Sequence, residues 1–232
     1  MIRIGVDFGG TKIEVAALDE AGAFKARVRR PNPANYEGAV ATVRDLIAEV
    51  ERDAGVVFGA ILGTGCGGGV VVRGQTVEGA NRIGGEWGHT PLPWPKPEEY
   101  AAHACWCGRS NCLETWVSGT AFWEDYERAS GVKLAGEQIV ERARQGEAAA
   151  SGALDRYVDR LGRALAVIAD ILDPDAIVLG GGMSNTAELY ARVPPVVARY
   201  AFSDIFVTPI RPAKYGDSSG VRGAAWLWPA GP

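Results

Sequence analysis

The sequence predicts a two-lobed α/β protein, and three observations support this fold class. A Gly-rich turn between two apolar strands occurs at residues 5–12 and recurs at residues 63–69. Apolar strands and helical stripes alternate along the rest of the chain, and a cysteine cluster follows the second turn. Because adjacent glycines allow positive φ and bring backbone N–H groups close to an anion, the paired turns indicate two related lobes facing a nucleotide. Two ordinary hairpins are the alternative, since Gly-Gly is also a turn signal.

The N-terminal part predicts a meander of strands and one helix before the second turn. Apolar residues run or alternate in the strands, and they recur with helical spacing in the helix, which Gly55 ends. The expected elements are strands at residues 2–7, 12–19 and 23–30, a helix at 36–53, and strands at 56–62 and 70–78.

The C-terminal part predicts helices and a last pair of strands. Residues 90–112, here called the Pro-rich segment, hold four prolines, and an irregular segment of that length is expected to be anchored. Gly180, Gly181 and Gly182 form a third Gly-rich turn directly after a strand. The expected elements are helices at 113–130, 135–145 and 151–172, a strand at 176–179, a helix at 186–200 interrupted by Pro194 and Pro195, a strand at 206–212 and a helix at 219–228.

The composition argues against several classes of protein. The 24 basic and 28 acidic residues give a net charge of −4, which indicates neither a nucleic-acid partner nor binding to an anionic membrane. No apolar run approaches the roughly 20 residues that a membrane helix needs, and the N-terminus has no signal-peptide pattern. We therefore expect a cytoplasmic protein, in which clustered cysteines are metal ligands rather than disulfides.

The cysteine cluster is the most specific signal of the chain. Cys105, Cys107 and Cys112 lie within eight residues. Three thiolates and one imidazole make a closed tetrahedral zinc site, which would tie down the Pro-rich segment. His89 is the expected fourth ligand, and His103 competes with it because it is closer in sequence. Reduced structural cysteines without a metal are the alternative.

Asp7 ends the first strand, next to the glycines of the first turn. A carboxylate at this place can hold Mg²⁺, or the waters around it, against nucleotide phosphates. An Asx-type turn residue is the alternative. The turn is not a Walker motif, because the chain has no Gly-x-x-x-x-Gly-Lys-Ser/Thr pattern.

Glu86, His89 and Glu114 predict a sugar site. If His89 binds zinc, both glutamates are held near it, because Glu86 stands three residues before this histidine and Glu114 two residues after the last cysteine. Carboxylates and an imidazole suit hydrogen bonds to sugar hydroxyls, and solvated loop positions are the alternative. Cys66, inside the second turn, is predicted to be a packing residue, because no histidine is placed in sequence to activate it as a nucleophile.

These motifs together resemble the ROK family of sugar kinases and repressors, within the actin/hexokinase/Hsp70 superfamily. Residues 7–12 look like the family's first phosphate motif and residues 62–69 like its second, with Cys66 in place of an expected apolar residue. Residues 178–182 resemble its adenosine motif. Residues 88–114, from Gly-His to Leu-Glu, match its zinc signature closely.

The resemblance implies an actin/hexokinase/Hsp70-like fold and phosphorylation of a hexose by ATP, with structural zinc and with Mg²⁺ accompanying ATP. Residues 91–95, Pro-Leu-Pro-Trp-Pro, are similar to the fructokinase-like members, so fructose is the expected hexose. The repressor members carry an N-terminal helix-turn-helix, so a chain starting at the first strand favours a kinase. The implied ATP-binding residues are Asp7, Gly9, Gly10, Thr11, Lys12, Gly63, Thr64, Gly65, Gly180, Gly181 and Gly182. The implied sugar-binding residues are Glu86, His89 and Glu114, and the implied zinc ligands are His89, Cys105, Cys107 and Cys112.

The chain departs from the family pattern near Gly55. Family members carry a further crossover between the helix ending near residue 54 and the strand starting at residue 56, and such a unit takes at least about 30 residues. The family's general-base aspartate falls in that stretch, so no catalytic residue is assigned here, and Asp53 matches no family motif. We expect a shortened N-terminal lobe at residues 1–55 and a C-terminal lobe at residues 56–232, whose last helix can return to the first lobe.

The shortened lobe leads to two further expectations. A general base contributes about 10²–10⁴-fold to the rate, so a non-catalytic relative that binds nucleotide or sugar is the alternative to a working kinase. The sheet of this lobe would also keep an open edge, which invites pairing with another chain. We therefore expect a homo-oligomer, in the simplest case a dimer.

Overall fold

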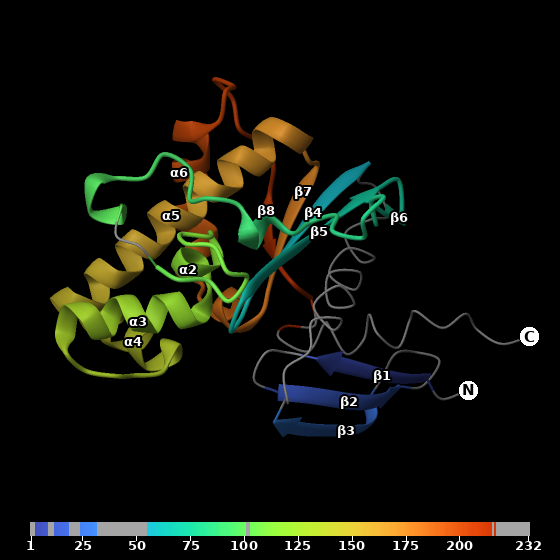
Figure 1. Cartoon of the computed structure of the whole chain (residues 1–232), viewed down its shortest axis with the longest axis horizontal. Coiled ribbons are helices and arrows are strands. Elements are labelled where there is room, and N and C mark those ends of the chain that lie inside the picture. Colours follow the sequence, from blue (N-terminus) through green and yellow to red (C-terminus); the bar gives the residue numbers. More distant parts are fainter. Residues whose placement is uncertain are drawn as a thin grey trace, which may run out of the picture.

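The protein forms two β-sheets, with helices packed on the second. The computed structural model describes residues 3–8, 12–18, 24–31, 55–100, 103–214 and 216, the first three ranges as backbone only. The first sheet has the strand order β1-β2-β3 and the second the order β6-β5-β4-β7-β8, and Figure 1 shows the two sheets apart from each other. The strands are β1 (Arg3–Phe8), β2 (Lys12–Leu18), β3 (Phe24–Pro31), β4 (Val56–Leu62), β5 (Cys66–Val72), β6 (Gln75–Thr76), β7 (Ala176–Gly180) and β8 (Ile210–Pro212).

Most of the helices lie between β6 and β7 in the chain, and the last two helical elements connect β7 to β8. The helical elements include three short 3-10 turns, labelled η, and five α-helices among the described residues. These elements are η1 (Trp87–His89), η2 (Pro97–Glu99), α2 (Glu114–Val117), α3 (Gly119–Ser130), α4 (Gly136–Arg144), α5 (Ala148–Leu172), η3 (Gly182–Asn185) and α6 (Glu188–Tyr200).

The first sheet confirms the N-terminal meander. Both of its strand pairs are antiparallel, with Asp7 opposite Glu14 and Lys12 opposite Pro31. The two-lobed α/β fold class is thus confirmed at the level of architecture. The predicted helices at 36–53 and 219–228 lie outside the described residues, and the division at residue 55 stays a prediction.

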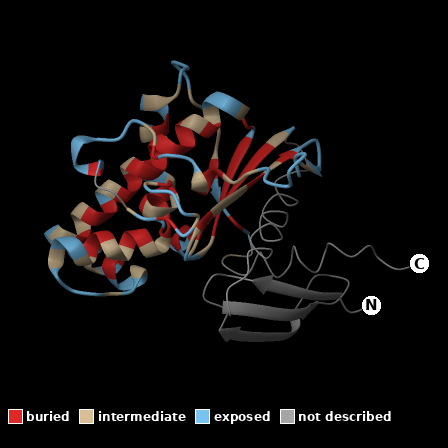
Figure 2. Ribbon diagram, viewed as in Figure 1, coloured by how far each residue is buried: buried red, intermediate tan, exposed pale blue. Residues whose placement is uncertain are grey.

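The second sheet is mixed and builds the main core on one face. Strand β4 pairs antiparallel with β5 and parallel with β7, which in turn pairs parallel with β8. Because side chains alternate along a strand, Phe58, Ala60 and Leu62 point to one face, and they join the apolar face of α5 in one buried cluster. Figure 2 shows the buried residues along α5 and these strands.

The central helix α5 is longer than its neighbours because its apolar stripe continues for 25 residues. Leu161 and Leu165 on this stripe are fully buried. Asp173 takes a left-handed conformation with φ of 41° directly after it, and Pro174 follows. The predicted end of this helix at residue 172 is confirmed.

Two predicted helices differ from the structure. The helix expected at 113–130 is broken into α2 and α3 at Ser118, whose backbone is extended and whose hydroxyl accepts a hydrogen bond from the Ala121 N–H at 3.0 Å. The helix expected to be interrupted by Pro194 and Pro195 runs through them as α6. Its buried face, with Val193 and Val197, packs in the main core, and this packing outweighs the two missing N–H donors.

Two predicted strands also differ. β5 begins at Cys66 and not at residue 70, because the glycines that follow pair with β4, and it ends in a two-residue hairpin. Arg73 and Gly74 in that hairpin both have positive φ, as a type I′ turn requires. β8 is shorter than expected, since only residues 210–212 pair with β7.

None of the helices in the described part of the chain is both long and apolar enough to cross a membrane.

Candidate functional site

The second Gly-rich turn lies at the end of β4 and is shorter than the sequence predicts. Only residues 63–65 form the turn, with a hydrogen bond from the Gly63 N–H to the Gly65 carbonyl at 3.0 Å. The expected turn residues 66–69 are part of β5. Gly68 is needed there because a Cβ at this position would lie 2.8 Å from the Trp87 ring and 2.9 Å from that of Phe58.

The third Gly-rich turn lies beside the second. Since β4 and β7 are parallel, with Ile61 opposite Gly180, their carboxyl ends open at the same edge of the sheet. Gly181 has a φ of 79°, and a Cβ there would lie 2.6 Å from the Leu62 carbonyl. Both the conformation and the contact therefore require glycine. In parallel sheets, ligands bind at this edge.

The first Gly-rich turn is described only in part. Asp7 and Lys12 lie in β1 and β2, while Gly9, Gly10 and Thr11 lie outside the described residues. How Asp7 would meet Mg²⁺ therefore stays a prediction from the sequence.

The start of α3 supports the second turn from the other side. The Gly119 N–H donates to the Gly63 carbonyl at 2.6 Å, and a Cβ at Gly119 would lie 3.0 Å from that oxygen. Nothing in the sequence marks this glycine, because it stands inside a helical pattern. The break at Ser118, which places Gly119 at the start of α3, is seen only in the structure.

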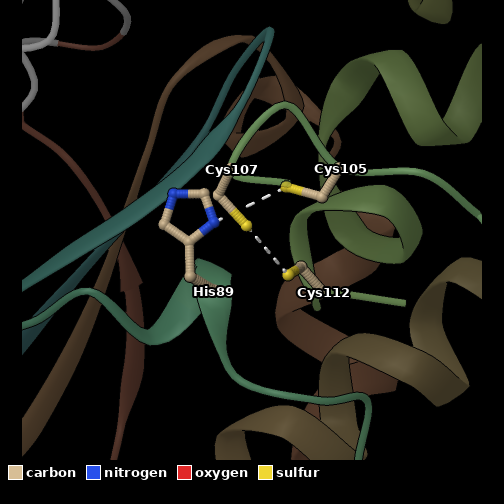
Figure 3. Close-up of side chains that lie close together, drawn as sticks. All are labelled: His89, Cys105, Cys107 and Cys112. Atoms are coloured by element: carbon tan, nitrogen blue, oxygen red, sulfur yellow. Dashed lines mark hydrogen bonds between the residues drawn. The ribbon is translucent and has the colours of Figure 1, made fainter. Parts of the chain in front are cut away.

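His89 and the three cysteines come together in one cluster, here called the Cys₃His cluster (Figure 3). Their ligand atoms lie within 4.8 Å of one another. The Sγ atoms of Cys107 and Cys112 are 3.6 Å apart, and Cys105 Sγ is 3.6 Å from His89 Nδ1. Two sulfurs bound tetrahedrally at about 2.3 Å from one metal ion would be about 3.8 Å apart, so these four residues fit a single ion.

The Cys₃His cluster also has the local structure of a closed site. A hydrogen bond from the Gly108 N–H to the Cys105 carbonyl, 3.0 Å long, folds the chain between the cysteines. Burial raises the pKa of the Cys112 thiol to about 12 and also raises that of Cys105. The backbone hydrogen bond from Arg109 lowers the pKa of the Cys107 thiol. A bound metal ion favours the thiolate form of all three.

His103, the competing ligand, lies elsewhere. Among the described residues the cluster includes His89 and not His103. The His103 ring packs against Trp116 with 4.4 Å between ring centroids, and the His103 backbone N–H donates to the Asn111 side chain at 2.8 Å. Closeness in sequence therefore did not bring His103 into the cluster, although it directly precedes the antiparallel bridge between Ala104 and Ser110.

The predicted sugar residues gather where the Cys₃His cluster meets the second turn. Glu86 precedes η1, which carries His89, and Glu114 begins α2. The Cys66 N–H donates to Glu114 Oε2 at 3.0 Å. Burial raises the pKa of the Cys66 thiol, and the charges of Glu114 and Glu86 raise it further. Cys66 is buried, as the prediction of a packing residue required.

Trp106 is a site residue that the sequence analysis missed. It stands between Cys105 and Cys107, the residue is 70% exposed, and its ring meets the His89 ring edge to face with 5.0 Å between centroids. Its position between Cys105 and Cys107 was the available signal.

Comparison with known proteins identifies the family. The family model described as "ROK family" matches residues 3–60 and 52–230. An N-acetyl-D-glucosamine kinase of Pectobacterium carotovorum is 39% identical over 176 residues, which are 74% of this chain and 58% of that protein. One of Vibrio atlanticus is 38% identical over 180 residues, 76% of this chain and 60% of that protein. The chain thus spans about three fifths of the length of these relatives.

Solved structures share the fold at lower sequence identity. A ROK family glucokinase from Streptomyces griseus, in complex with glucose and AMPPNP, is 21% identical with a TM-score of 0.84, covering 98% of this chain and 99% of that chain. The ROK hexokinase from Thermus thermophilus is 22% identical with a TM-score of 0.74, covering 97% of each chain. The family match over most of the chain, together with the Gly-rich turns and the Cys₃His cluster, shows that this protein belongs to the ROK family.

Proposed function

We propose that this protein is an ATP-dependent kinase of an N-acetylated hexose or of glucose. The observation that carries the proposal is the placement of two Gly-rich turns beside a Cys₃His cluster, in a chain 39% identical to an N-acetyl-D-glucosamine kinase. The expectation of fructose has no support among these relatives. It rested on the Pro-rich residues 91–95, and those residues serve a structural contact, since the carbonyls of Pro93 and Trp94 both accept hydrogen bonds from Arg163.

The Gly-rich turns are the proposed nucleotide site. Residues 63–65 and 180–182 stand at the carboxyl ends of two parallel strands, where backbone N–H groups can reach phosphate and adenosine. The first turn, residues 7–12, is assigned to phosphate from the resemblance, with Asp7 as the residue for Mg²⁺.

Glu86, His89 and Glu114 are the proposed sugar side of the site. His89 faces the thiols through Nδ1, which leaves Nε2 as the polar atom available to a hydroxyl. In the reaction, a sugar hydroxyl oxygen forms a bond to the γ-phosphorus while the bond to the bridging oxygen of ADP breaks. The hydroxyl proton passes to a base that we do not assign.

Zinc is the metal that we propose for the Cys₃His cluster. Three sulfurs and one imidazole nitrogen are a donor set typical of closed structural zinc sites. Bound there, the ion would hold the Pro-rich segment and supply no step of the reaction. One zinc per chain, measured by elemental analysis of protein purified without chelator, is expected; a content well below one would contradict the assignment.

The reaction is tested by sugar-dependent ADP release from ATP and Mg²⁺. N-acetylglucosamine, N-acetylmannosamine, glucose, mannose and fructose form the panel. We expect the fastest turnover with N-acetylglucosamine or glucose, and its loss in an Asp7→Ala protein prepared in the same way. Turnover with fructose alone would overturn the proposed substrate class.

A non-catalytic relative that binds nucleotide or sugar is the second candidate. It is favoured because β4 begins at Val56, which leaves no room before it for the crossover that carries the family's general-base aspartate. The N–H groups of Gly55 and Val56 both donate to Asp175 Oδ2 at 2.8 Å. Binding of Mg·ADP without turnover of any sugar would support this candidate. The predicted dimer is tested separately, by the molar mass in light scattering.

A further inference from the structure

Glu114 lies between the Cys₃His cluster and the second Gly-rich turn and contacts both. Its Oε2 accepts a hydrogen bond from the Cys66 N–H at 3.0 Å. Its Oε1 lies 3.8 Å from the Sγ of Cys105. The residue begins α2, two positions after the ligand Cys112. One side chain therefore links the metal-binding loop to the backbone at the end of the turn.

The turn is shaped around this carboxylate. A Cβ on Gly65 would lie 2.4 Å from Glu114 Oε2, so any larger residue at this position would displace the end of the Glu114 side chain. On the opposite side, the Gly63 carbonyl accepts the hydrogen bond from Gly119. Both ends of the three-residue turn are thus fixed by the segment that follows the cysteines, residues 114–119.

We propose that Glu114, besides its proposed place on the sugar side of the site, is a positioning residue for the nucleotide turn, which it holds through the Cys66 backbone. This inference rests on the proposed function, because the turn at residues 63–65 is the proposed phosphate site. The Cys66 N–H is directed to Glu114, and the turn is thereby held in one conformation before nucleotide arrives. Such preorganisation raises affinity, because the backbone need not be ordered on binding.

The expected size of the effect follows from the lost hydrogen bond. Cys66 is buried, and truncation of Glu114 would remove the carboxylate that accepts from its N–H. The turn would then have to be ordered when nucleotide binds. We expect about a tenfold weaker nucleotide affinity, which corresponds to about 1.4 kcal/mol.

The first experiment measures Mg·ADP affinity and both KM values in Glu114→Ala, Glu114→Gln and Glu98→Ala. Glu98 is an exposed glutamate and serves as the matched control. Glu114→Ala is expected to weaken Mg·ADP binding about tenfold and to raise the KM for ATP together with that for the sugar. Glu114→Gln keeps an oxygen that can accept from Cys66 and should retain most of the affinity. A rise in the sugar KM alone would overturn the proposal.

A double-mutant cycle tests the geometry directly. Gly65→Ala places a methyl group against the Glu114 carboxylate and is expected to weaken Mg·ADP binding. Glu114→Ala removes the colliding atoms, so the double variant should bind about as well as Glu114→Ala alone. If the affinity loss of the double variant equalled the product of the two single-variant losses, the proposed contact would be wrong.

Hydrogen exchange separates failure of this inference from failure of the proposed function. We expect faster amide exchange over residues 62–68 in Glu114→Ala than in the wild type or Glu98→Ala, with similar exchange in α5. If the wild type binds no Mg·ADP, the proposed nucleotide site is wrong, while faster exchange still supports the link to the turn. Unchanged exchange in Glu114→Ala would overturn the link itself.

Discussion

The Pro-rich segment is attached to the rest of the protein in two places by two kinds of chemistry. In its first half, Glu99 is held by buried arginines of α5. At its end, Cys105, Cys107 and Cys112 converge with His89 in the Cys₃His cluster. The first attachment uses only groups of the chain itself, whereas the second has the donor set of the proposed zinc site. The two should therefore respond differently to mutation, chelation and pH.

The ionic attachment is almost entirely removed from water. Glu99 is 4% exposed and Arg163 is 0% exposed. Arg163 Nη2 donates to both Glu99 oxygens, at 2.7 and 2.8 Å, and its Nη1 donates to two backbone carbonyls of the Pro-rich segment. Arg160 joins Glu99 to Asp125 of α3. Every charge in this network has an opposite partner, which buried charges require.

The largest expected effect comes from Glu99→Ala. Removal of one partner of a buried ion pair leaves an uncompensated charge, so the free energy of unfolding should fall by about 3–5 kcal/mol. Guanidinium denaturation at neutral pH measures this, with Glu98→Ala, which removes an exposed carboxylate from the adjacent position, as the control. Equal midpoints for the two variants would show that the buried network contributes nothing to stability.

The metal attachment should give a smaller effect that depends on concentration. With free zinc 100-fold above its Kd, binding to the folded state alone adds about 2.7 kcal/mol. Wild-type protein should therefore melt at higher temperature as zinc is raised, and Cys112→Ser should not respond. Cys66→Ala, which removes a thiol outside the Cys₃His cluster, should respond as the wild type does. A zinc-dependent melting temperature in Cys112→Ser would contradict the assignment of this ligand.

The two attachments should also differ in pH dependence. Burial alone would raise the pKa of the Glu99 carboxyl, but hydrogen bonds from Arg163, the Lys96 N–H and Arg160 outweigh it and hold this pKa below its ordinary value of 4.5. Arg156 and Arg160 likewise outweigh burial at Asp125 and lower its pKa below 3.8. At low pH the unfolded chain then binds more protons than the folded one, so stability falls as pH falls through this range.

Metal affinity is itself pH-dependent, so the measurement uses Cys112→Ser, which lacks one residue of the Cys₃His cluster. Denaturation of this variant between pH 7 and pH 3 then reports the contribution of the buried ion pairs to stability. We expect its stability to be flat near neutral pH and to drop below about pH 4.5. Glu99→Gln in the same background should flatten part of that drop. An equally steep drop in both proteins would contradict the role of Glu99.

The contrast between the attachments also explains what the sequence could predict. The three cysteines lie within eight residues, so their spacing alone indicated a site. Glu99 and Arg163 are 64 residues apart, and Arg163 follows ordinary helix positions with nothing to mark it as buried. Long-range contacts of this kind depend on how α5 packs beneath the Pro-rich segment, which no local pattern encodes.

The second Gly-rich turn shows the same limit of prediction from sequence. The strand–turn–strand pattern correctly predicted β4, the turn and β5, but the extent of the turn was wrong. A run of glycines has no side chains to signal a strand. Gly68 pairs with Ala60 of β4, and this strand position holds a glycine because the Trp87 and Phe58 rings leave no room for a Cβ. The contact of Glu114 with Cys66, 48 residues away, was likewise beyond sequence reasoning, which placed this glutamate only near His89.

The smallest expected effect belongs to Trp106→Ala. The residue is mostly exposed, so the free energy of unfolding should change by no more than about 0.5 kcal/mol. Its ring contacts that of His89 edge to face and thereby restrains a proposed metal ligand. We therefore expect zinc to leave a few-fold faster in a chelator chase, while the denaturation midpoint in excess zinc stays near that of the wild type. Unchanged zinc release would show that the aromatic contact does not restrain the ligand, and that the short helix η1 alone sets the position of His89.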